Sequence, residues 1–230
     1  MALVSSDKKR VIRSFVVRSG RMTVGQQRGW EQYWDKLGLE FSAQKVDVAT
    51  LFDKAQPLVL EIGFGMGDSL FEMASANPNL NFIGVEVHRP GVGAILAKAG
   101  DAELNNLKVM CCDAVEFIDK MLPDESVSRL QLYFPDPWHK KRHHKRRLVQ
   151  PEFVSNILPK LSQGGVLHMA TDWQPYAEHM LEVLEASSEL KNQAGKGAFS
   201  EKPEFRPSTK FEKRGLKLGH SVWDLLFEKR

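Results

Sequence analysis

Short apolar segments alternate with amphipathic segments along most of this chain, and this alternation limits the fold more than any other feature. Apolar runs predict strands at 57–62, 81–87, 107–111, 127–134 and 165–170, and a closing strand at 222–227. Helical spacing predicts helices at 68–76, 90–99, 114–121, 152–161 and 173–186. Because repeated strand–helix units bury both faces of a sheet, the sequence predicts an α/β fold with a doubly wound, mainly parallel sheet.

Acids and glycines lie where the predicted strands end. In an open sheet of this type, ligands bind beyond the carboxyl ends of the strands, near the point where the strand order reverses. Glu61 stands near the end of the first strand, and Gly63, Gly65 and Gly67 form the turn after it. The later strands end near Glu86, Asp113, Asp136 and Asp172. These residues are therefore the candidates for a ligand site.

The glycine turn has the spacing G-x-G-x-G and is flanked by acids, unlike the G-x-G-x-x-G turn of dinucleotide folds. Glu86 follows Gly63 by 23 residues, close to the ~20-residue offset of an acid that binds ribose hydroxyls. Asp113 could accept a hydrogen bond from an adenine amino group. Glu61 and Asp68 disfavour a pyrophosphate and suit a cationic nucleoside such as S-adenosylmethionine. The alternatives are a purely structural turn, and N-cap or solvated positions for Glu86 and Asp113.

A turn with two prolines follows the fourth predicted strand, in the sequence YFPDPW at 133–138. Each proline restricts its own backbone and that of the residue before it, so Asp136 is held rigidly. A fixed acid and an aromatic residue at the ligand edge predict recognition of a nucleobase, with Trp138 available for stacking. The alternative is a rigid loop with a buried tryptophan.

Positive charge is concentrated in two segments, although the formal net charge is only +3. Of 32 Lys and Arg, six lie in the run HKKRHHKRR at 139–147, which leaves 26 against 29 Asp and Glu. Residues 1–28 hold seven more bases and one acid, so the remainder has 19 bases against 28 acids. An acidic body with two basic segments indicates a polyanion-binding protein, with a solvated charged face as the alternative.

The apolar segments, the cysteines and the histidines limit the class and location of the protein. No window approaches ~18 consecutive apolar residues, and the N-terminus lacks the apolar core of a signal peptide, so we expect no membrane span and a cytoplasmic protein. Cys111 and Cys112 are adjacent, which favours free thiols in a reducing compartment over a redox pair. His139, His143 and His144 could bind a metal, but neighbouring cations oppose this, so we expect none.

The two ends of the chain have distinct predicted roles. Residues 1–28 are polar and basic and predict a mobile arm, whereas residues 29–230 are expected to form the folded domain. Four apolar residues between positions 30 and 37 have the spacing of one helix face. Asp172 stands where it would either cap a helix or contact a ligand. The polar segment 206–215 could fold over the mouth of the site as a flap.

Several sequence segments together resemble one enzyme family. They are RSFVVRSGRMTVGQQ (13–27), EIGFGMG (61–67), GVEVHRPGVG (84–93), CDAVEF (112–117), FPDPWHKKRHHKRR (134–147), ATDWQPYAEHM (170–180) and RPSTKFEKRGLKLGH (206–220). The stretches near 40–55 and 187–203 carry no such motif. On these residues, the chain resembles the bacterial tRNA (guanine-N7-)-methyltransferases of the TrmB family.

This resemblance implies a class I S-adenosylmethionine-dependent methyltransferase of Rossmann-like fold that acts on tRNA, as a monomer or a homodimer. Asp136 is implied as the catalytic residue. The implied cofactor-binding residues are Glu61, Gly63, Gly65, Gly67, Glu86, Asp113 and Asp136. The implied substrate-binding residues are Lys140, Asp172, Thr209, Lys210, Phe211 and Glu212, and the implied RNA-binding residues are Arg142, His143, His144, Lys145, Arg146 and Arg147. The implied product is 7-methylguanosine at position 46, in the variable loop of the tRNA.

Three other classes of protein stay open on the residues alone. A dehydrogenase that uses NAD is disfavoured by the missing G-x-G-x-x-G turn and the lack of a clear hydride-transfer constellation. A non-catalytic RNA-binding module is disfavoured because the acids around the glycine turn are retained. A methyltransferase that acts on a small molecule or a protein is disfavoured by the two basic segments.

Overall fold

The computed structural model describes residues 13–16, 20–208, 212 and 221–230. Within these residues, seven strands form one sheet in the order β3-β2-β1-β4-β5-β7-β6. The strands are β1 (Leu58–Ile62), β2 (Asn81–Val85), β3 (Leu107–Met110), β4 (Val127–Tyr133), β5 (Leu161–Thr171), β6 (Leu190–Asn192) and β7 (Trp223–Lys229). β1 to β5 pair in parallel, and β7 runs antiparallel between β5 and β6. The predicted mainly parallel sheet is confirmed.

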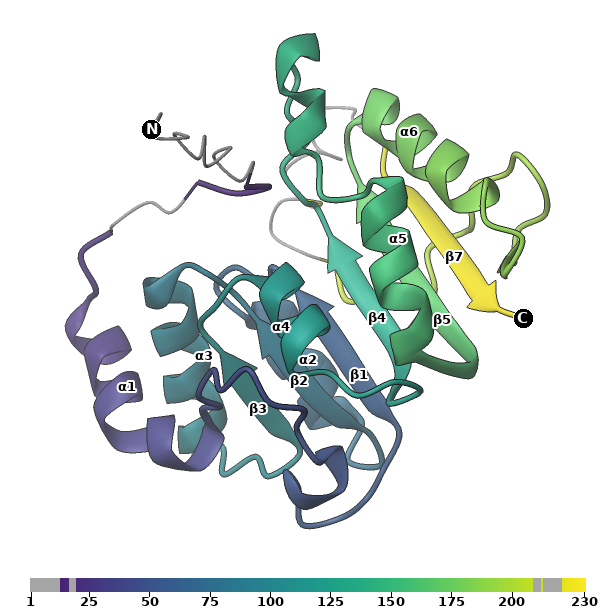
Figure 1. Ribbon diagram of the computed structural model, residues 1–230. Helices are drawn as coiled ribbons and strands as arrows, with labels where there is room; N and C mark the ends of the chain where they lie inside the picture. The colour runs from purple at the N-terminus through teal and green to yellow at the C-terminus, as the bar shows by residue number, and fades with distance from the viewer. Residues whose placement is uncertain (1–12, 17–19, 209–211, 213–220) are drawn as a thin grey trace, which may run out of the picture.

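Helices cover both faces of the sheet (Figure 1). They are α1 (Val24–Leu37), α2 (Asp68–Ala76), α3 (Arg89–Asp101), α4 (Ala114–Lys120), α5 (Pro151–Ile157) and α6 (Gln174–Glu185), with short 3-10 helices η1 (Val48–Thr50), η2 (Lys141–Arg146) and η3 (Leu158–Lys160). One apolar core joins the sheet to α4, α5 and α6, and a second joins it to α1, α2 and α3. These two cores make the sheet doubly wound, with the strand order reversing between β1 and β4.

The close crossing of α1 and α3 depends on two glycines. A Cβ atom on Gly29 would lie 2.2 Å from the carbonyl oxygen of Gly93, and one on Gly93 would lie 2.5 Å from the carbonyl oxygen of Gln26. Both contacts are with backbone, which cannot move aside easily. The helix that follows the basic arm is therefore packed directly on the folded domain.

The helix α1 begins at Val24, inside the stretch 1–28 that was predicted to be the arm. Thr23 accepts a hydrogen bond from the amide of Gln26 at 3.3 Å, and the Gln26 side chain accepts one from the amide of Thr23 at 2.8 Å. This reciprocal capping box fixes the start of the helix. Residues 1–12 and 17–19 lie outside the described residues, so the mobility of the arm stays a prediction.

Two other element boundaries differ from the predictions. The helix predicted at 152–161 ends at Ile157, because Pro159 has no amide hydrogen to continue an α-helix and a 3-10 turn takes its place. β5 then begins at Leu161, four residues before its predicted start. β6 was not predicted at all, since its three residues are too few to show a period. By contrast, α2 begins and ends where the sequence predicts.

A polar patch occupies the face of the sheet opposite α5 and α6. Gln131 and His168 occupy paired positions on β4 and β5, and Asp224 reaches His168 from β7. These side chains are buried beneath the chain segment 199–208, whose Phe205 packs against His168 at 5.5 Å between ring centroids. A loop segment, not a helix, therefore covers this half of the sheet.

The part of the chain that the structure describes has neither a helix long and apolar enough to cross a membrane nor a cluster of three or more His, Cys, Asp or Glu side chains placed to hold a metal ion.

Candidate active site

The ends of β1, β2, β3 and β4 surround a cavity of about 220 Å³. It includes four of the residues that the sequence analysis assigns to the cofactor: Gly63, Glu86, Asp113 and Asp136. The cavity lies at the carboxyl edge of the sheet, where the strand order reverses, as expected for a ligand site in this type of fold.

The glycine turn serves the cavity and the packing of the domain in different ways. Gly63 has a φ of +73°, and nothing lies within 4 Å of a Cβ placed on it, so its open side can receive a ligand. Gly67 has a φ of +76° and caps the start of α2; a Cβ there would lie 2.6 Å from the Cβ of Ile95 on α3. Gly63 lines the cavity, whereas Gly65 and Gly67 shape the turn beside it.

Glu86 fixes the glycine turn to the end of β2. One carboxylate oxygen accepts a hydrogen bond from the amide of Gly65 at 2.8 Å. The other accepts from the amides of Val87 and His88 at 2.7 and 3.0 Å. The same side chain lines the cavity, so it can hold the turn and face a ligand together.

Asp113 also combines two positions that the sequence left as alternatives. It caps α4 by accepting a hydrogen bond from the amide of Val115 at 3.0 Å, and it lines the cavity. Burial raises the pKa of its carboxyl group above the ordinary value. Its neighbour Cys112 lines the cavity too, and burial raises the pKa of that thiol to about 12, which keeps it protonated and unreactive.

Glu61, near the end of β1, is a buried acid that is not among the residues lining the cavity. It is 3% exposed, and its Oε2 has no hydrogen-bond partner among the described residues. Burial raises the pKa of this carboxyl group to about 8, opposed by the charge of Arg129 and reinforced by that of Glu86. A buried ionised carboxylate without a partner is costly, so Glu61 favours either a proton or a nearby cation.

The turn after β4 holds Asp136 at the cavity. Asp136 is exposed and lines the cavity, and the amide of Phe134 donates to the carbonyl oxygen of Ala170 at 2.8 Å. The predicted stacking role of Trp138 is not supported. Its indole N–H donates to the carbonyl oxygen of Ser14 at 3.0 Å, and the guanidinium of Arg146 lies 4.0 Å from its ring centroid.

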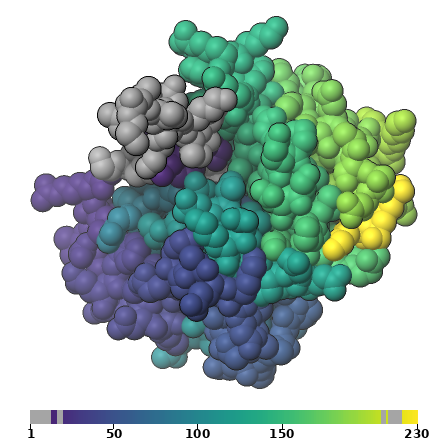
Figure 2. Space-filling model, in the orientation of Figure 1, coloured from purple at the N-terminus to yellow at the C-terminus, as the bar shows by residue number. Residues whose placement is uncertain are grey.

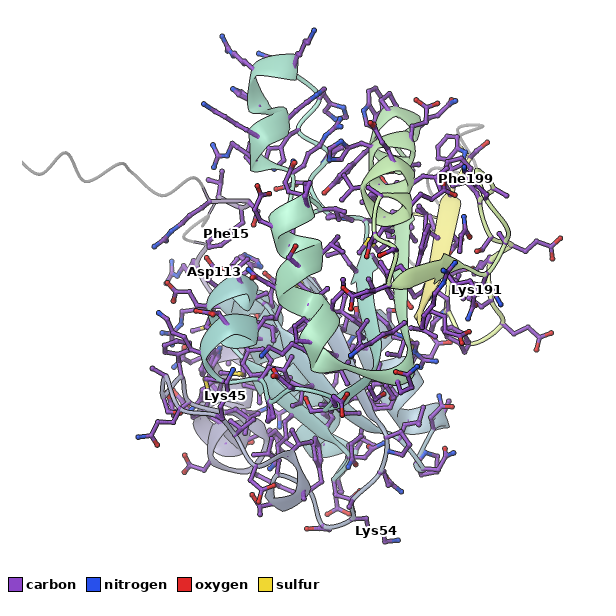
Figure 3. All side chains as sticks on the ribbon, turned by 45° about the vertical axis from the view of Figure 1, so that its right-hand side comes forward. Phe15, Lys45, Lys54, Asp113, Lys191 and Phe199 are labelled. Carbon is purple, nitrogen blue, oxygen red and sulfur yellow. The ribbon has the colours of Figure 1, made fainter. Side chains whose placement is uncertain are left out.

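The basic run folds into η2, which projects beyond the body of the molecule (Figure 2). Its nitrogen-tipped side chains spread into solvent at the same end of the molecule (Figure 3). The exposed bases are Lys140, Lys141, Arg142 and Lys145. His143 is half-buried, and burial together with the surrounding cations lowers the pKa of its imidazole below the ordinary value.

Two arginines of the run, both predicted to bind RNA, face inward. Arg147 is 4% exposed and donates to the carbonyl oxygens of Pro137 and Pro175 at 3.0 and 3.4 Å. It also contacts His144 at 3.3 Å and so ties that histidine to the base of η2. Arg146 donates to the carbonyl oxygens of Arg13 and Phe15 at 3.1 and 3.2 Å.

The arm forms one wall of the cavity, which the sequence analysis did not predict. Ser14 and Phe15 line the cavity, held there by Trp138 and Arg146. Figure 3 places Phe15 just above Asp113. The signal in the sequence is weak, because a single phenylalanine in a basic segment does not reveal which distant strand ends it contacts.

The remaining predicted substrate residues fall into three groups. Asp172 and Lys140 are exposed on neighbouring turns, which meet where the rings of His139 and Trp173 lie 4.3 Å apart. Asp172 is not a helix cap, since Trp173 holds the cap position of α6. Glu212 is buried and bonded to Arg206. Thr209, Lys210 and Phe211 lie outside the described residues.

Known proteins agree with this architecture. Residues 55–225 match the family model described as "Putative methyltransferase". Among solved structures, the 16S rRNA methyltransferase KamB superposes with a TM-score of 0.61 at 18% identity, covering 84% of this chain and 97% of that one. The antibiotic-resistance methyltransferase Kmr superposes with a TM-score of 0.55 at 15% identity, covering 85% of this chain and 98% of that one. These superpositions show the shared fold.

Much more similar proteins define the family. The tRNA (guanine-N(7)-)-methyltransferase of Psychromonas ingrahamii is 59% identical over 96% of this chain and 90% of its own length. The protein of the same name from Serratia proteamaculans is 58% identical over 96% of this chain and 92% of its own length. With this identity along nearly the whole chain, and with a cavity at the strand ends of a methyltransferase fold, the protein is an enzyme that belongs to the tRNA (guanine-N(7)-)-methyltransferase family.

Proposed function

We propose that this enzyme transfers a methyl group from S-adenosylmethionine to N7 of a guanine in tRNA, at position 46 of the variable loop, and forms 7-methylguanosine. The observation that carries the proposal is the meeting of two surfaces. An acid-lined cavity lies at the strand ends, and the exposed bases of the basic run begin at Lys140, four residues after Asp136, the last of those acids. The names of the relatives support the same substrate.

The residues of the cavity fit the proposed cofactor. Glu86 and Asp113 both line the cavity, and their carboxylates would accept hydrogen bonds from ribose hydroxyls and an adenine amino group. The unpartnered carboxylate oxygen of Glu61 suits a cationic ammonium group. When bound, S-adenosylmethionine supplies an electrophilic methyl group.

Asp136 is proposed to orient the reacting groups. Guanine N7 carries a lone pair and no proton, so the methyl transfer needs no general base. The residues of the site then contribute by holding the two partners in line, ~3 Å apart, and by accommodating the positive charge that moves to the guanine ring. An exposed carboxylate at the rim of the cavity, fixed between two prolines, is suited to that task.

The tRNA is proposed to lie across η2 and the turn that carries Asp172. Lys140, Lys141, Arg142 and Lys145 would meet its phosphates, because their ammonium and guanidinium groups face solvent. Asp172 and the segment 209–211 would contact the nucleotides nearer the cavity. Glu212 would act indirectly, since its carboxylate is already bonded to Arg206.

Replacing Lys141, Arg142 and Lys145 with alanine should weaken tRNA binding and make its dependence on salt concentration less steep by about two to three units, because three phosphate contacts are lost. Affinity is measured by filter binding across a salt series. Alanine at Lys54, Lys191 and Lys196 is the matched control, since these lysines are also exposed but lie elsewhere (Lys54 and Lys191 in Figure 3). An unchanged slope in the first variant would show that η2 is only a solvated face.

The proposed reaction is tested with the purified enzyme, labelled S-adenosylmethionine and an unmodified tRNA transcript. Borohydride–aniline cleavage of the product then maps any 7-methylguanine. We expect label and cleavage at position 46, and neither in a transcript with adenine at that position. Label at another guanine would contradict the assigned position, and the absence of label would contradict the function.

A further inference from the structure

A buried ionic cluster joins the sheet to Arg206 and Glu212, the two ends of the chain segment 206–212. Its centre is Arg206, which is 1% exposed and lies between two carboxylates. Arg206 donates to both oxygens of Asp224 on β7, each at 2.8 Å. It also donates to both oxygens of Glu212, at 2.8 and 3.1 Å. One guanidinium therefore links a strand of the sheet to the far end of the segment.

The cluster continues to the strand that carries the catalytic turn. The Nε2 of His168 lies 2.7 Å from Asp224, and its Nδ1 lies 2.9 Å from the hydroxyl of Tyr133. Burial lowers the pKa of His168, so the ring is neutral; it donates to Asp224 and accepts from Tyr133. Tyr133 lines the cavity and stands three residues before Asp136. The segment is thus tied to the end of β4 by a continuous chain of hydrogen bonds.

The charges in the cluster are balanced. Asp224 and Glu212 bring two negative charges, Arg206 brings one positive charge, and Lys202 adds a second at 3.3 Å from Glu212. A buried ionic group held in this way has one favoured geometry, because any displacement leaves a charge without its partner. Arginine is also the residue suited to the centre, since its planar group can face two carboxylates in a bidentate manner.

We propose that Arg206 is a positioning residue of the methyl transfer, and that it holds Glu212 in register with the end of β4. This inference rests on the proposed function, because Glu212 belongs to the proposed substrate site. Arg206 touches neither tRNA nor cofactor in this role. It acts through Glu212 on one side and through Asp224, His168 and Tyr133 on the other.

The experiment compares Arg206→Lys and Glu212→Gln with the wild-type protein. Lysine keeps the positive charge but loses the bidentate geometry, and glutamine keeps one oxygen acceptor but loses the charge. We expect each variant to lower the single-turnover rate of tRNA methylation at least about ten-fold at saturating substrates, because the reacting groups are displaced. Affinity for S-adenosylmethionine, measured by calorimetry, should stay within about two-fold, since the cluster lines the cavity only through Tyr133.

Leu225→Val is the control for a purely structural effect. Leu225 neighbours Asp224 on β7, is 1% exposed and points into the opposite core, against the α4–α6 side of the sheet. The substitution should lower the melting temperature and leave the single-turnover rate unchanged at temperatures where the protein is folded. The same loss of rate in this variant, at equal melting temperature, would overturn the inference.

Two further outcomes decide the matter. If Arg206 acts through Glu212, the double variant should lose no more rate than the worse single variant, whereas additive losses would overturn the proposal.

If Arg206→Lys does not fold, Glu212→Gln alone decides, and a rate within about two-fold of wild type overturns the proposal. If the wild-type protein methylates tRNA and both variants do so at the wild-type rate, only this inference is overturned. An inactive wild type defeats the proposed function and this inference together.

Discussion

Replacing Asp136 with alanine should lower the single-turnover rate of tRNA methylation by about 100-fold or more. The carboxylate stands at the rim of the cavity between two prolines, where a small displacement of the reacting groups is costly. The rate is measured with enzyme in excess over tRNA and with saturating S-adenosylmethionine, so that binding does not limit it. Asp35→Ala, on the exposed face of α1, is the matched control and should leave the rate unchanged.

The pH profile of Asp136→Asn separates orientation from proton removal. Asparagine keeps the shape and one oxygen acceptor, so a residue that only orients its partners should lose a similar factor at every pH. A general base would instead lose most of its effect where the wild-type carboxyl group is ionised. Because guanine N7 has no proton to give, we expect a loss independent of pH. A loss confined to high pH would contradict the orienting role.

Replacing Glu61 with glutamine should weaken S-adenosylmethionine binding about 10- to 100-fold above about pH 8 and remove part of its pH dependence. Burial raises the pKa of Glu61 to about 8, so the side chain of the cofactor-free enzyme is mostly protonated at pH 7. A cation bound beside the carboxyl group lowers that pKa, so binding releases a proton. The affinity of the wild type, relative to that of Glu61→Gln, should therefore rise with pH up to about 8 and level off above it.

Calorimetry in buffers of different ionisation enthalpy measures the released proton directly. The ammonium group of the ligand titrates in the same range, but its contribution is common to both proteins and cancels in their difference. Equal proton release by the wild type and Glu61→Gln would show that Glu61 does not face the charge of the ligand.

Thermal unfolding of the same variant gives an independent check. The carboxyl group of Glu61 has a higher pKa in the folded protein than its ordinary value of 4.5, so it destabilises the fold progressively as pH rises from about 4.5 to about 8. Glutamine removes this effect. The melting temperature of Glu61→Gln, relative to wild type, should increase between about pH 6 and about pH 8. A difference in melting temperature that does not change with pH would argue against a raised pKa.

The residues at the strand ends could be predicted to lie together, because the alternation of strands and helices makes the strands parallel and brings their carboxyl ends to one edge. Once β1 to β4 are parallel, Gly63, Glu86, Asp113 and Asp136 must lie at one edge, whatever the details of each helix. The hydrogen bonds that Glu86 and Asp113 accept from backbone amides were less predictable. Whether an acid after a strand caps a helix or faces a ligand depends on a few degrees of backbone rotation, and Asp113 does both.

The interior bonds of the basic run could not be predicted from composition. Lys145, Arg146 and Arg147 are consecutive bases, yet the first is exposed, the second contacts the arm and the third is buried. Their directions follow from the three-residue turn of η2 and from acceptors elsewhere in the chain, which for Arg146 lie more than a hundred positions away. The ionic cluster around Arg206 was hidden for the same reason, because its partners come from three separate segments.

The wall that Ser14 and Phe15 add to the cavity has a practical consequence for anyone who prepares this enzyme. The sheet and α1, with its Thr23 cap, would remain complete in a protein trimmed to begin at residue 20, and such a protein would pass the usual tests of folding. Its cavity would nevertheless lack one side, and Trp138 and Arg146 would lose the carbonyl oxygens they now hold. The length of the N-terminus is thus part of the binding site, and ligand affinities are comparable only between preparations that share it.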